Sequence, residues 1–381
     1  MARKRILEIL SSCDYEGGWR QCALLAAQLP PQEFDVQFCL LSRNRSGELL
    51  LKKTSLPVHA VGYGHKPDFW VLWPLVRLIR QWKPDLLHSW DSTANVYGPL
   101  AGRIAGVKTI FCSVSDATDQ KSKGKIFVDR LLKKHITKII IPSRRLCDVN
   151  HTLMHFANEK LVVIPPAIAM TPNTTIDRED LLQKLQIPEN SQLIAISDPM
   201  QVGNRLRDVI WATELLKVAG NNVQVFICGK GPQRKALERF RNRVHLQDRI
   251  HFLDDHHLID QLMEHLDLFW KISGYSYTAG NQLIEAMRRA IPVIADESLV
   301  HQEFIQHEKT GILVPIGDRA ALASWTQHLL ENPEYSKRIG TTGQTAVKNK
   351  YDPKTTILTQ TKLYQQTLKH YPLSYTNTPK P

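Results

Sequence analysis

The segment from Asp267 to Leu299 holds the residues best suited to chemistry in this chain. Its pattern predicts a short apolar strand, a loop, a helix and a second buried strand, in that order. Such a loop directs free backbone N–H groups and the positive end of a helix dipole to one place, which suits a phosphate group. The predicted helix carries one acidic residue, Glu285. Its predicted start consists of Thr278, Ala279, Gly280 and Asn281.

Two runs of alternating strands and helices position this segment. In the first run we expect strands at 5–10, 35–41, 85–89, 108–113 and 138–142, with helices at 19–29, 69–82, 94–105 and 127–135. In the second we expect strands at 193–197, 223–228 and 250–253, with helices at 206–219, 233–242, 255–262, 319–330 and 334–350. The fold class is therefore α/β, with two doubly wound, Rossmann-like domains. The loops that follow the strands of such a sheet open at one edge, where ligands bind.

The length of 381 residues exceeds the usual size of one domain. We expect an N-terminal domain at 1–170 and a C-terminal domain at 171–355, with a polar linker at 171–178. A tail helix follows, and residues 371–381 are expected to be disordered.

The composition, 43% hydrophobic and 23% charged, is typical of a soluble globular protein, and no apolar run is long enough to span a bilayer. The N-terminal residues indicate a first buried strand and not a signal peptide, so we expect the chain to stay in the cytoplasm. The six cysteines include no C-x-x-C pair. Free, buried thiols are therefore expected in preference to disulfides or a zinc site.

The net charge of +12 is concentrated between Lys121 and Arg145, where nine basic residues stand with one acidic residue, Asp129. One interpretation is a solvated helix face with a loop. The other is a surface that docks on anionic lipid headgroups at the inner face of the plasma membrane, where each basic residue contributes roughly 1 kcal/mol. Nucleic acid is not an expected partner, because no binding motif or aromatic interleaving accompanies the charge.

Several motifs together resemble the group 1, family 4 glycosyltransferases. Within the 267–299 segment, Glu285-Ala286-Met287 and Pro292-Val293 match the family pattern E-A-M-A-x-G-x-P-V, with Ala290 in place of its glycine. Further matches run along the chain in the family's order: Gly17-Gly18, Pro84 to His88, Ala101 to Gly106, Ile140 to Ser143, Leu161 to Pro165, Phe226 to Pro232 and Gly311 to Val314.

This resemblance implies the GT-B architecture: two Rossmann-like domains facing each other across a cleft, with a helix at 356–370 crossing back to the first domain. It also implies transfer of a sugar from a nucleoside-diphosphate sugar to a glycan, lipid-linked or envelope acceptor, with retention of configuration. The donor is expected in the C-terminal domain and the acceptor in the N-terminal one. No metal and no permanently bound cofactor are expected.

The resemblance also assigns donor-binding residues. Glu285 matches the glutamate that binds the ribose hydroxyls, for which a carboxylate forms charge-assisted hydrogen bonds; the alternative is an exposed helix residue. The glycines without side chains allow a phosphate to approach the backbone closely. The donor-binding set is Gly17, Gly18, Gly229, Thr278, Ala279, Gly280, Asn281 and Glu285.

The chain departs from the family at the charged positions. Asp198 or Pro199 stands at the usual arginine position and Asn204 at the usual lysine position. Either Arg205 or Arg207 could supply the missing charge, and Arg205 is preferred; the alternative is that both are surface arginines at a helix start. Ser115 and Asp116 replace the active-site histidine motif, and Tyr277 replaces the first glutamate. The expected reaction centre therefore consists of Arg205, Asp116 and Tyr277.

These departures favour an alternative function, a degenerate transferase that binds nucleotide, glycan or a partner enzyme without turnover. A nucleotide-sugar epimerase on the same architecture is less consistent with the residues near Ser115, which lack the carboxylates and histidines it needs. Nicotinamide-dependent oxidation is disfavoured because the first turn lacks G-x-G-x-x-G.

Overall fold

The computed structural model describes residues 3–13, 18–42, 45–62, 69–114, 133–145, 158–167, 176–201, 203–254, 256–272 and 281–370. It divides into two compact units. Unit 1 comprises residues 1–167 and 353–381, and unit 2 comprises residues 168–352. No helix among the described residues is both long and apolar enough to cross a membrane.

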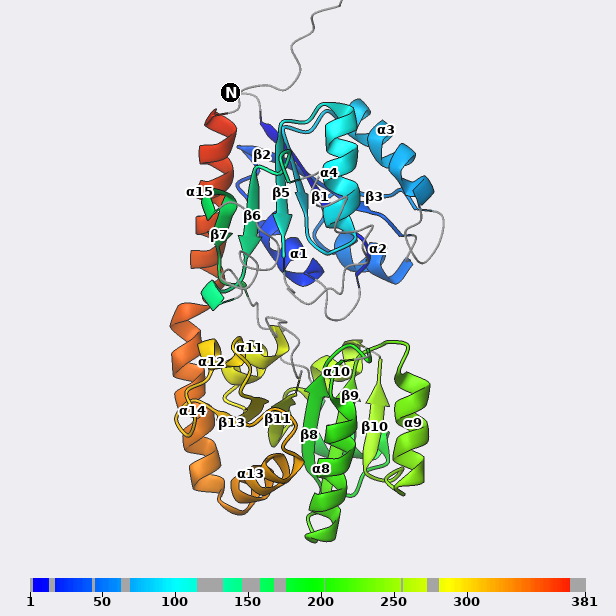
Figure 1. Cartoon of the computed structure of the whole chain (residues 1–381), viewed down its shortest axis with the longest axis vertical. Coiled ribbons are helices and arrows are strands. Elements are labelled where there is room, and N and C mark those ends of the chain that lie inside the picture. Colours follow the sequence, from blue (N-terminus) through cyan, green and yellow to red (C-terminus); the bar gives the residue numbers. More distant parts are fainter. Residues whose placement is uncertain are drawn as a thin grey trace, which may run out of the picture. The chain divides into compact units, whose positions relative to one another are not determined.

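The described part of unit 1 contains a parallel seven-stranded sheet with the strand order β3-β2-β1-β4-β5-β6-β7 (Figure 1). Its strands are β1 (Lys4–Leu10), β2 (Phe34–Leu40), β3 (Val58–Ala60), β4 (Leu86–Ser89), β5 (Thr109–Ser113), β6 (Lys138–Ile141) and β7 (Leu161–Val163). Its helices are α1 (Trp19–Gln28), α2 (Arg45–Lys52), η1 (Phe69–Val71), α3 (Leu72–Trp82), α4 (Ala94–Ala105), η2 (Asn158–Lys160) and α15 (Pro353–His370).

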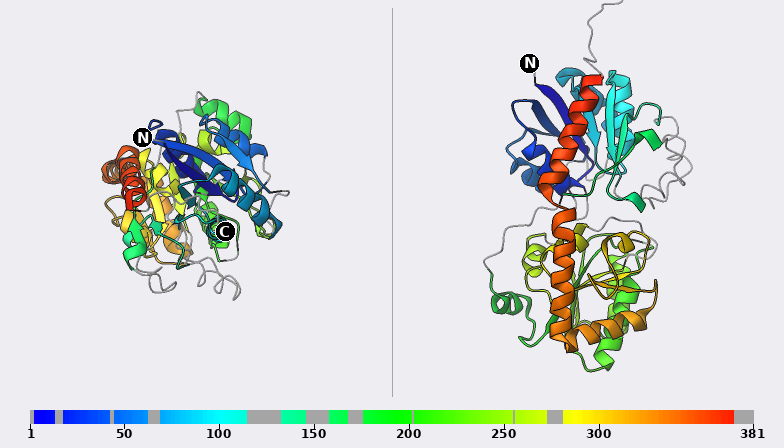
Figure 2. Two further views of the ribbon diagram at one scale, coloured as in Figure 1. Left: turned by 90° about the horizontal axis from the view of Figure 1, so that it is seen from above. Right: turned by 90° about the vertical axis from the view of Figure 1, so that its left-hand side faces the viewer.

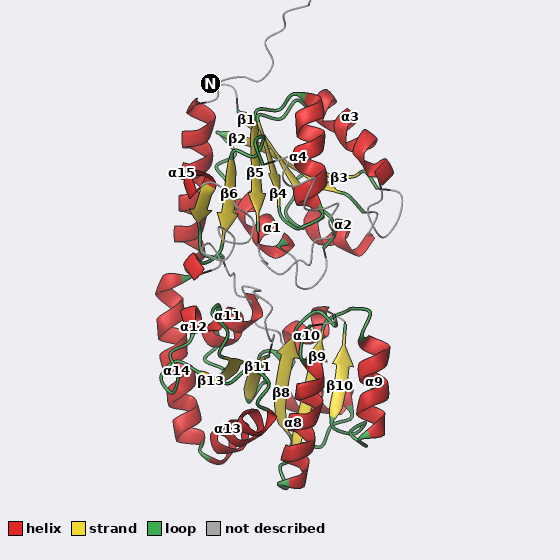
Figure 3. Cartoon of the chain, in the orientation of Figure 1, coloured by secondary structure: helices red, strands yellow, loops and turns green. Residues whose placement is uncertain are grey.

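Helices cover both faces of this sheet (Figure 3), because successive side chains of each strand point to opposite faces. In β1, Ile6 and Leu10 pack with α1 and α15, whereas Leu7 and Ile9 pack with α3 and α4. Figure 2 shows α15 lying along the strands of unit 1. Strands buried on both faces have nearly continuous apolar sequences, which explains the runs that predicted them.

The described part of unit 2 contains a parallel six-stranded sheet with the order β10-β9-β8-β11-β12-β13. Its strands are β8 (Gln192–Ser197), β9 (Val223–Cys228), β10 (Ile250–Leu253), β11 (Leu268–Lys271), β12 (Val293–Asp296) and β13 (Ile312–Val314). Its helices are α7 (Arg178–Leu185), α8 (Leu206–Val218), α9 (Arg234–Arg243), α10 (His256–Leu262), α11 (Asn281–Arg288), α12 (His301–Phe304), α13 (Arg319–Glu331) and α14 (Pro333–Lys350).

The strand order of unit 2 reverses at β8, which has β9 on one side and β11 on the other. Ligands of doubly wound sheets bind outside the carboxyl ends of the strands at such a reversal. One face of the sheet is covered by α8, α9 and α13, whose apolar side chains form a continuous core with the strands. The prediction of two Rossmann-like parallel sheets is confirmed.

The short elements that were not predicted from the sequence include α2, β3, α7, α12 and β13. The predicted helix at 127–135 lies outside the described residues except for its last three positions, which form a turn. The five described cysteines are free and buried, as expected.

Candidate functional site

A buried ion pair lies at the carboxyl edge of unit 2, where its strand order reverses. Lys271, the last residue of β11, places its Nζ 2.5 Å from Oδ1 of Asp198 and 3.1 Å from the carbonyl oxygen of Ser197. Both side chains of the pair are almost completely buried. The carboxylate of Asp198 is therefore paired with a lysine from the neighbouring strand.

The loops after β8 and β9 pack tightly against each other. A Cβ on Gly229, whose φ is +140°, would lie 2.4 Å from the carbonyl oxygen of Asp198. A Cβ on Gly231 would lie 2.4 Å from the carbonyl oxygen of Met200. The backbone N–H of Met200 also donates to the carbonyl oxygen of Lys230 at 3.0 Å. Gly229 is therefore required by the packing of two loops, whatever ligand the edge binds.

Arginines line a cavity of about 490 Å³ at this edge, at the N-terminal ends of α8, α9 and α13. The carboxylate of Asp208 accepts hydrogen bonds from Nε of Arg205 at 2.5 Å and from Nε of Arg319 at 2.7 Å. The guanidinium group of Arg207 lies 5.7 Å from the centre of the Phe240 ring. The lining residues are Gln201, Gly203, Asn204, Arg205, Arg207, Asp208, Gln233, Leu237 and Arg319.

The charge balance of this cavity favours an anion. Asp208 supplies one negative charge, whereas Arg205, Arg207 and Arg319 supply three positive charges. An arginine bound through Nε keeps further N–H donors for a ligand. Asn204 donates from Nδ2 to the carbonyl oxygen of Pro199 at 2.7 Å. The cations that could meet a phosphate are therefore the arginines around Asp208.

Glu285 belongs to a second cluster of unit 2. It lies in α11 and is 8% exposed. Arg289 donates to its Oε1 at 3.2 Å and lies 3.5 Å from Oε1 of Glu264. Asn281 is the first residue of the same helix. Glu285 is therefore not the exposed helix residue of the alternative interpretation.

In unit 1, the loops after β1 and β4 meet at the carboxyl edge. Gly18 precedes α1, and a Cβ there would lie 3.1 Å from the carbonyl oxygen of Trp90. Asp91 accepts from the backbone N–H groups of Ser11 at 2.6 Å and Ala94 at 2.9 Å, so it joins the β1 loop to the start of α4. Burial raises the pKa of the Asp91 carboxyl, and these backbone hydrogen bonds oppose the rise.

A buried polar network links the centre of this sheet to α15. Nδ1 of His88 lies 2.5 Å from the Tyr364 hydroxyl, which also donates to Oε1 of Glu8 at 3.2 Å. Nε2 of His88 lies 2.8 Å from Oγ of Ser113, and Trp90 donates to Oε2 of Glu8 at 2.5 Å. Burial raises the pKa of the Tyr364 hydroxyl well above its usual value, and the Glu8 carboxylate adds to the rise. His88 therefore anchors α15 inside the core.

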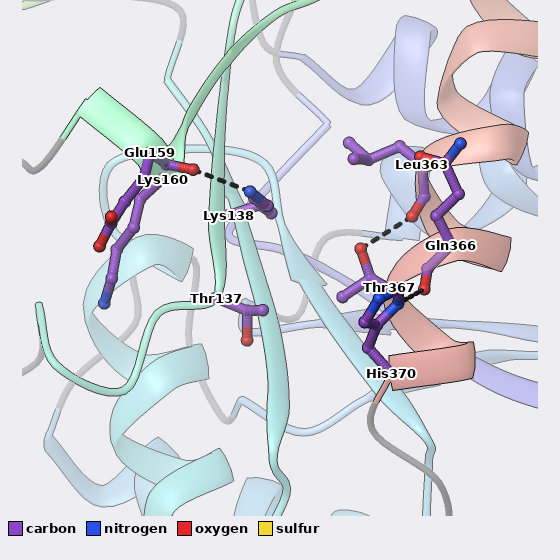
Figure 4. Close-up of a pocket in the computed structure, with 8 residues that line it drawn as sticks. All are labelled: Thr137, Lys138, Glu159, Lys160, Leu363, Gln366, Thr367 and His370. Atoms are coloured by element: carbon purple, nitrogen blue, oxygen red, sulfur yellow. Dashed lines mark hydrogen bonds between the residues drawn. The ribbon is translucent and has the colours of Figure 1, made fainter.

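A second, larger cavity of about 690 Å³ lies in unit 1 at the amino-terminal ends of β6 and β7 (Figure 4). Lys138 donates to the carbonyl oxygen of Glu159 at 2.8 Å, and Lys160 to that of Lys133 at 2.8 Å. The rest of the wall comes from the last turns of α15. This is the edge opposite to the loops that follow the strands, so it is not the expected ligand edge.

Two family models match adjacent parts of the chain. Residues 15–171 match glycosyltransferase family 4, and residues 177–346 match glycosyl transferases group 1. The chain belongs to this glycosyltransferase family.

Solved structures with the GT-B fold align with almost the whole family 4 chain. HepE from Anabaena, solved in complex with UDP-glucose, aligns with a TM-score of 0.79 at 20% identity over 96% of this chain and 100% of that chain. Sucrose-phosphate synthase from Thermosynechococcus elongatus aligns with a TM-score of 0.78 at 17% identity over 97% of this chain and 100% of that chain.

Curated relatives are similar over a part of the chain. N-acetyl-alpha-D-glucosaminyl L-malate synthase from Bacillus anthracis is 25% identical over 175 residues, 46% of this chain and 45% of that protein. The 2-deoxystreptamine N-acetyl-D-glucosaminyltransferase from Niallia circulans is 28% identical over 144 residues, 37% of this chain and 36% of that protein. The chain thus spans less than half the length of the curated relatives it matches.

Several predicted residues of this family 4 chain lie outside the described residues, namely Gly17, Asp116, Tyr277, Thr278, Ala279 and Gly280, together with residues 121–132 of the basic segment. The described residues of the prediction fall into separate places: Arg205 in the arginine cavity, Gly229 between two loops, Asn281 and Glu285 on α11, and Gly18 beside Trp90.

Sequence reasoning missed three residues of the unit 2 edge. Lys271 ends an otherwise apolar strand, and a lysine inside an apolar run is itself a signal of a buried partner. Asp208 stands three residues after Arg205, a spacing that brings side chains together on a helix. Arg319 carried no local signal, because its partner is 111 residues away.

Proposed function

We propose that this chain is a glycosyltransferase that moves a sugar from a nucleoside-diphosphate sugar to an acceptor hydroxyl. The observation that supports it is the cavity of unit 2 at the carboxyl edge of the sheet, which is lined by three arginines, Arg205, Arg207 and Arg319, and by one carboxylate, Asp208. A diphosphate has the charge and size to replace solvent there. Glu285 is assigned to the ribose hydroxyls of the same donor.

The chemistry needs this positive charge. When the bond between the anomeric carbon and the phosphate oxygen breaks, the leaving diphosphate gains negative charge, and cations fixed near it lower the barrier. The acceptor hydroxyl forms the new glycosidic bond with the anomeric carbon and gives its proton to the leaving diphosphate, with retention of configuration. Because the protein supplies the cations, the proposal requires no metal ion and no permanent cofactor.

We assign the acceptor to unit 1, where the loops after β1 and β4 are held together by Asp91. The acceptor class is a glycan or a lipid-linked or envelope molecule. Support comes from relatives such as the lipopolysaccharide core biosynthesis glycosyltransferase LpsD from Rhizobium meliloti, 24% identical over 133 residues, which are 35% of this chain and 38% of that protein.

Thermal-shift titration with UDP, GDP and ADP tests the donor proposal. A ligand at about 100 times its dissociation constant adds about 2.7 kcal/mol to stability, so one of the three should raise the melting temperature clearly. The nucleotide that does so identifies the base. If none of them shifts the melting temperature at millimolar concentration, the donor proposal is wrong.

A second candidate is a transferase-like protein that binds nucleotide without turnover. It is favoured by the sequence expectation that Asn204 occupies the family's lysine position and that Asp198 or Pro199 occupies its arginine position. In the structure Asp198 pairs with Lys271, and Asn204 donates to the carbonyl oxygen of Pro199. The two candidates separate in a transfer assay with the nucleotide sugar of the identified base. Release of nucleoside diphosphate that depends on acceptor supports the enzyme, and binding without release supports the second candidate.

A further inference from the structure

An aromatic cluster at the start of α3 is exposed to solvent. Phe69, Trp70 and Trp73 are 64%, 68% and 57% exposed. The rings of Phe69 and Trp70 pack edge to face, with centroids 6.4 Å apart. In contrast, Leu72 and Leu75 of the same segment point into the core. A contiguous patch of large exposed aromatic side chains is unusual on a protein that has no partner for it.

The charge on the same helix is entirely positive. Arg77 and Arg80 are exposed along α3, and Lys83 is exposed directly after it. The sequence from Phe69 to Pro84 contains no acidic residue. Tryptophan and phenylalanine rings beside arginines are the side chains that favour the interface of an anionic bilayer.

The position of the patch connects it with the acceptor edge. The strands of unit 1 are parallel, and α3 leads into β4, so α3 starts at the carboxyl edge and ends at the amino edge of the sheet. The aromatic residues are at the start of α3, on the same edge as the loops after β1 and β4. The arginines continue from there along the helix.

We propose that the exposed face of η1 and α3, formed by Phe69, Trp70, Trp73, Arg77 and Arg80, docks unit 1 on an anionic lipid bilayer. The aromatic rings enter the headgroup region and the arginines bind lipid phosphates. This surface is different from the basic segment that starts at Lys121. The docking surface itself does not depend on the proposed function. One consequence rests on that function: an acceptor bound at this edge is a lipid-linked molecule presented by the membrane.

Vesicle flotation tests the docking surface. The full chain is mixed with vesicles of phosphatidylcholine alone or with about 30% phosphatidylglycerol, so that part of the surface is anionic. Wild-type protein is expected to float with the anionic vesicles. The double variant Trp70→Ala with Trp73→Ala should lower the partition coefficient about tenfold, because it removes most of the apolar area available to the bilayer.

Two further variants make the test specific. Arg77→Gln should weaken flotation about fivefold with anionic vesicles and leave binding to neutral ones unchanged. Leu215→Ala with Val218→Ala is the matched control, because these side chains of α8 are 43% and 78% exposed but belong to unit 2. The control should float like wild type.

Flotation and nucleotide binding give separate answers. If wild type does not float with anionic vesicles, or if the tryptophan variant floats as wild type does, the docking proposal is overturned, and a protein partner becomes the better occupant. Melting-temperature shifts with the nucleoside diphosphate are measured on the same samples. A retained shift together with failed flotation leaves the proposed transferase intact, whereas flotation without any shift refutes the donor site alone.

Discussion

Lys271 and Asp198 form a buried ion pair at the carboxyl ends of two neighbouring strands of unit 2. The two side chains are 2% and 0% exposed, and Nζ lies 2.5 Å from Oδ1. A buried pair of this kind contributes little net stability, yet removal of one partner leaves an isolated charge in the core. The pair therefore holds the carboxyl ends of β8 and β11 in a fixed position relative to each other.

We expect Lys271→Met to lower the free energy of unfolding by about 3–5 kcal/mol, because the Asp198 carboxylate then stays buried without its cation. Adding Asp198→Asn should recover more than half of this loss. Urea denaturation of the three proteins measures both effects. A loss below about 1 kcal/mol in the single variant would show that the Asp198 carboxylate is neutralised in another way.

The sequence predicted residues of this edge better than it predicted their partners. Arg205 and Glu285 were predicted from motif position, and both lie in charged clusters of unit 2. Lys271 and Arg319 were missed because their partners come from other strands and helices, and such contacts depend on strand order. The local pattern of a single sequence does not contain the order of the strands.

A strained residue, Ala290, follows the end of α11. Ala290 has a φ of +59°, in the left-handed region that is usual after the last turn of a helix. A residue with a Cβ pays roughly 1–2 kcal/mol there, and glycine does not. The helix nevertheless ends at this point, because the chain must turn into Pro292 and β12.

We expect Ala290→Gly to stabilise the protein by about 0.5–1 kcal/mol, since relief of strain exceeds the entropy of about 0.4–1 kcal/mol that glycine adds to the unfolded chain. Ala219→Gly is the control, because Ala219 also follows a helix but has a φ of −72°. That variant should be destabilised. Calorimetric melting of both variants decides the sign, and destabilisation by Ala290→Gly would contradict the strain argument.

The outer strand at one edge of each sheet carries a histidine paired with a glutamine on the next strand. His59 of β3 lies 2.8 Å from Oε1 of Gln37, and His251 of β10 lies 2.7 Å from Oε1 of Gln224. Burial lowers the pKa of both imidazoles from the usual 6.5, and for His251 the nearby Arg241 lowers it further. Both rings are therefore neutral in the folded protein near neutral pH.

A lowered folded-state pKa makes stability depend on pH in one direction. Above about pH 6.5 the imidazole is neutral in both the folded and the unfolded protein. As the pH falls below this value, the unfolded chain binds a proton before the folded protein does, so the free energy of unfolding decreases until the pH has passed the folded-state pKa. We expect His251→Gln to reduce the loss of unfolding free energy between about pH 8 and about pH 5.5. Equal losses in the variant and the wild type, measured by urea unfolding, would assign the pH dependence to other groups.

At the scale of elements, long apolar runs were predicted well and short outer elements were not. β1, β8 and β9 are central strands whose continuous apolar sequence follows from burial on two faces. In contrast, β3 has three residues, none of them buried, so it has no pattern to detect. The order of the strands, which places Lys271 beside Asp198, became known only from the structure.

At the scale of the whole molecule, the chain consists of two units that resemble each other in architecture, and their described residues differ in charge at the carboxyl edges of the two sheets. In unit 1, Asp91 connects the loops after β1 and β4. Tyr364 of α15 forms hydrogen bonds with His88 and Glu8 of the sheet. Unit 2 presents three arginines around Asp208. This asymmetry is the physical basis for assigning the anionic donor to unit 2.

Calorimetric titration of the nucleoside diphosphate selected by thermal shift tests this assignment most directly. Two variants are compared: Arg205→Gln, which lines the cavity, and Arg234→Gln, which does not. The two arginines are 33% and 30% exposed; Arg205 pairs with Asp208, and Arg234 pairs with Glu238 and, at 3.8 Å, with Asp254. Loss of a charge-assisted contact should weaken binding about 10–100-fold for Arg205→Gln, and Arg234→Gln should stay within about twofold of wild type. Unchanged affinity in Arg205→Gln, or equal losses in both variants, would contradict the account.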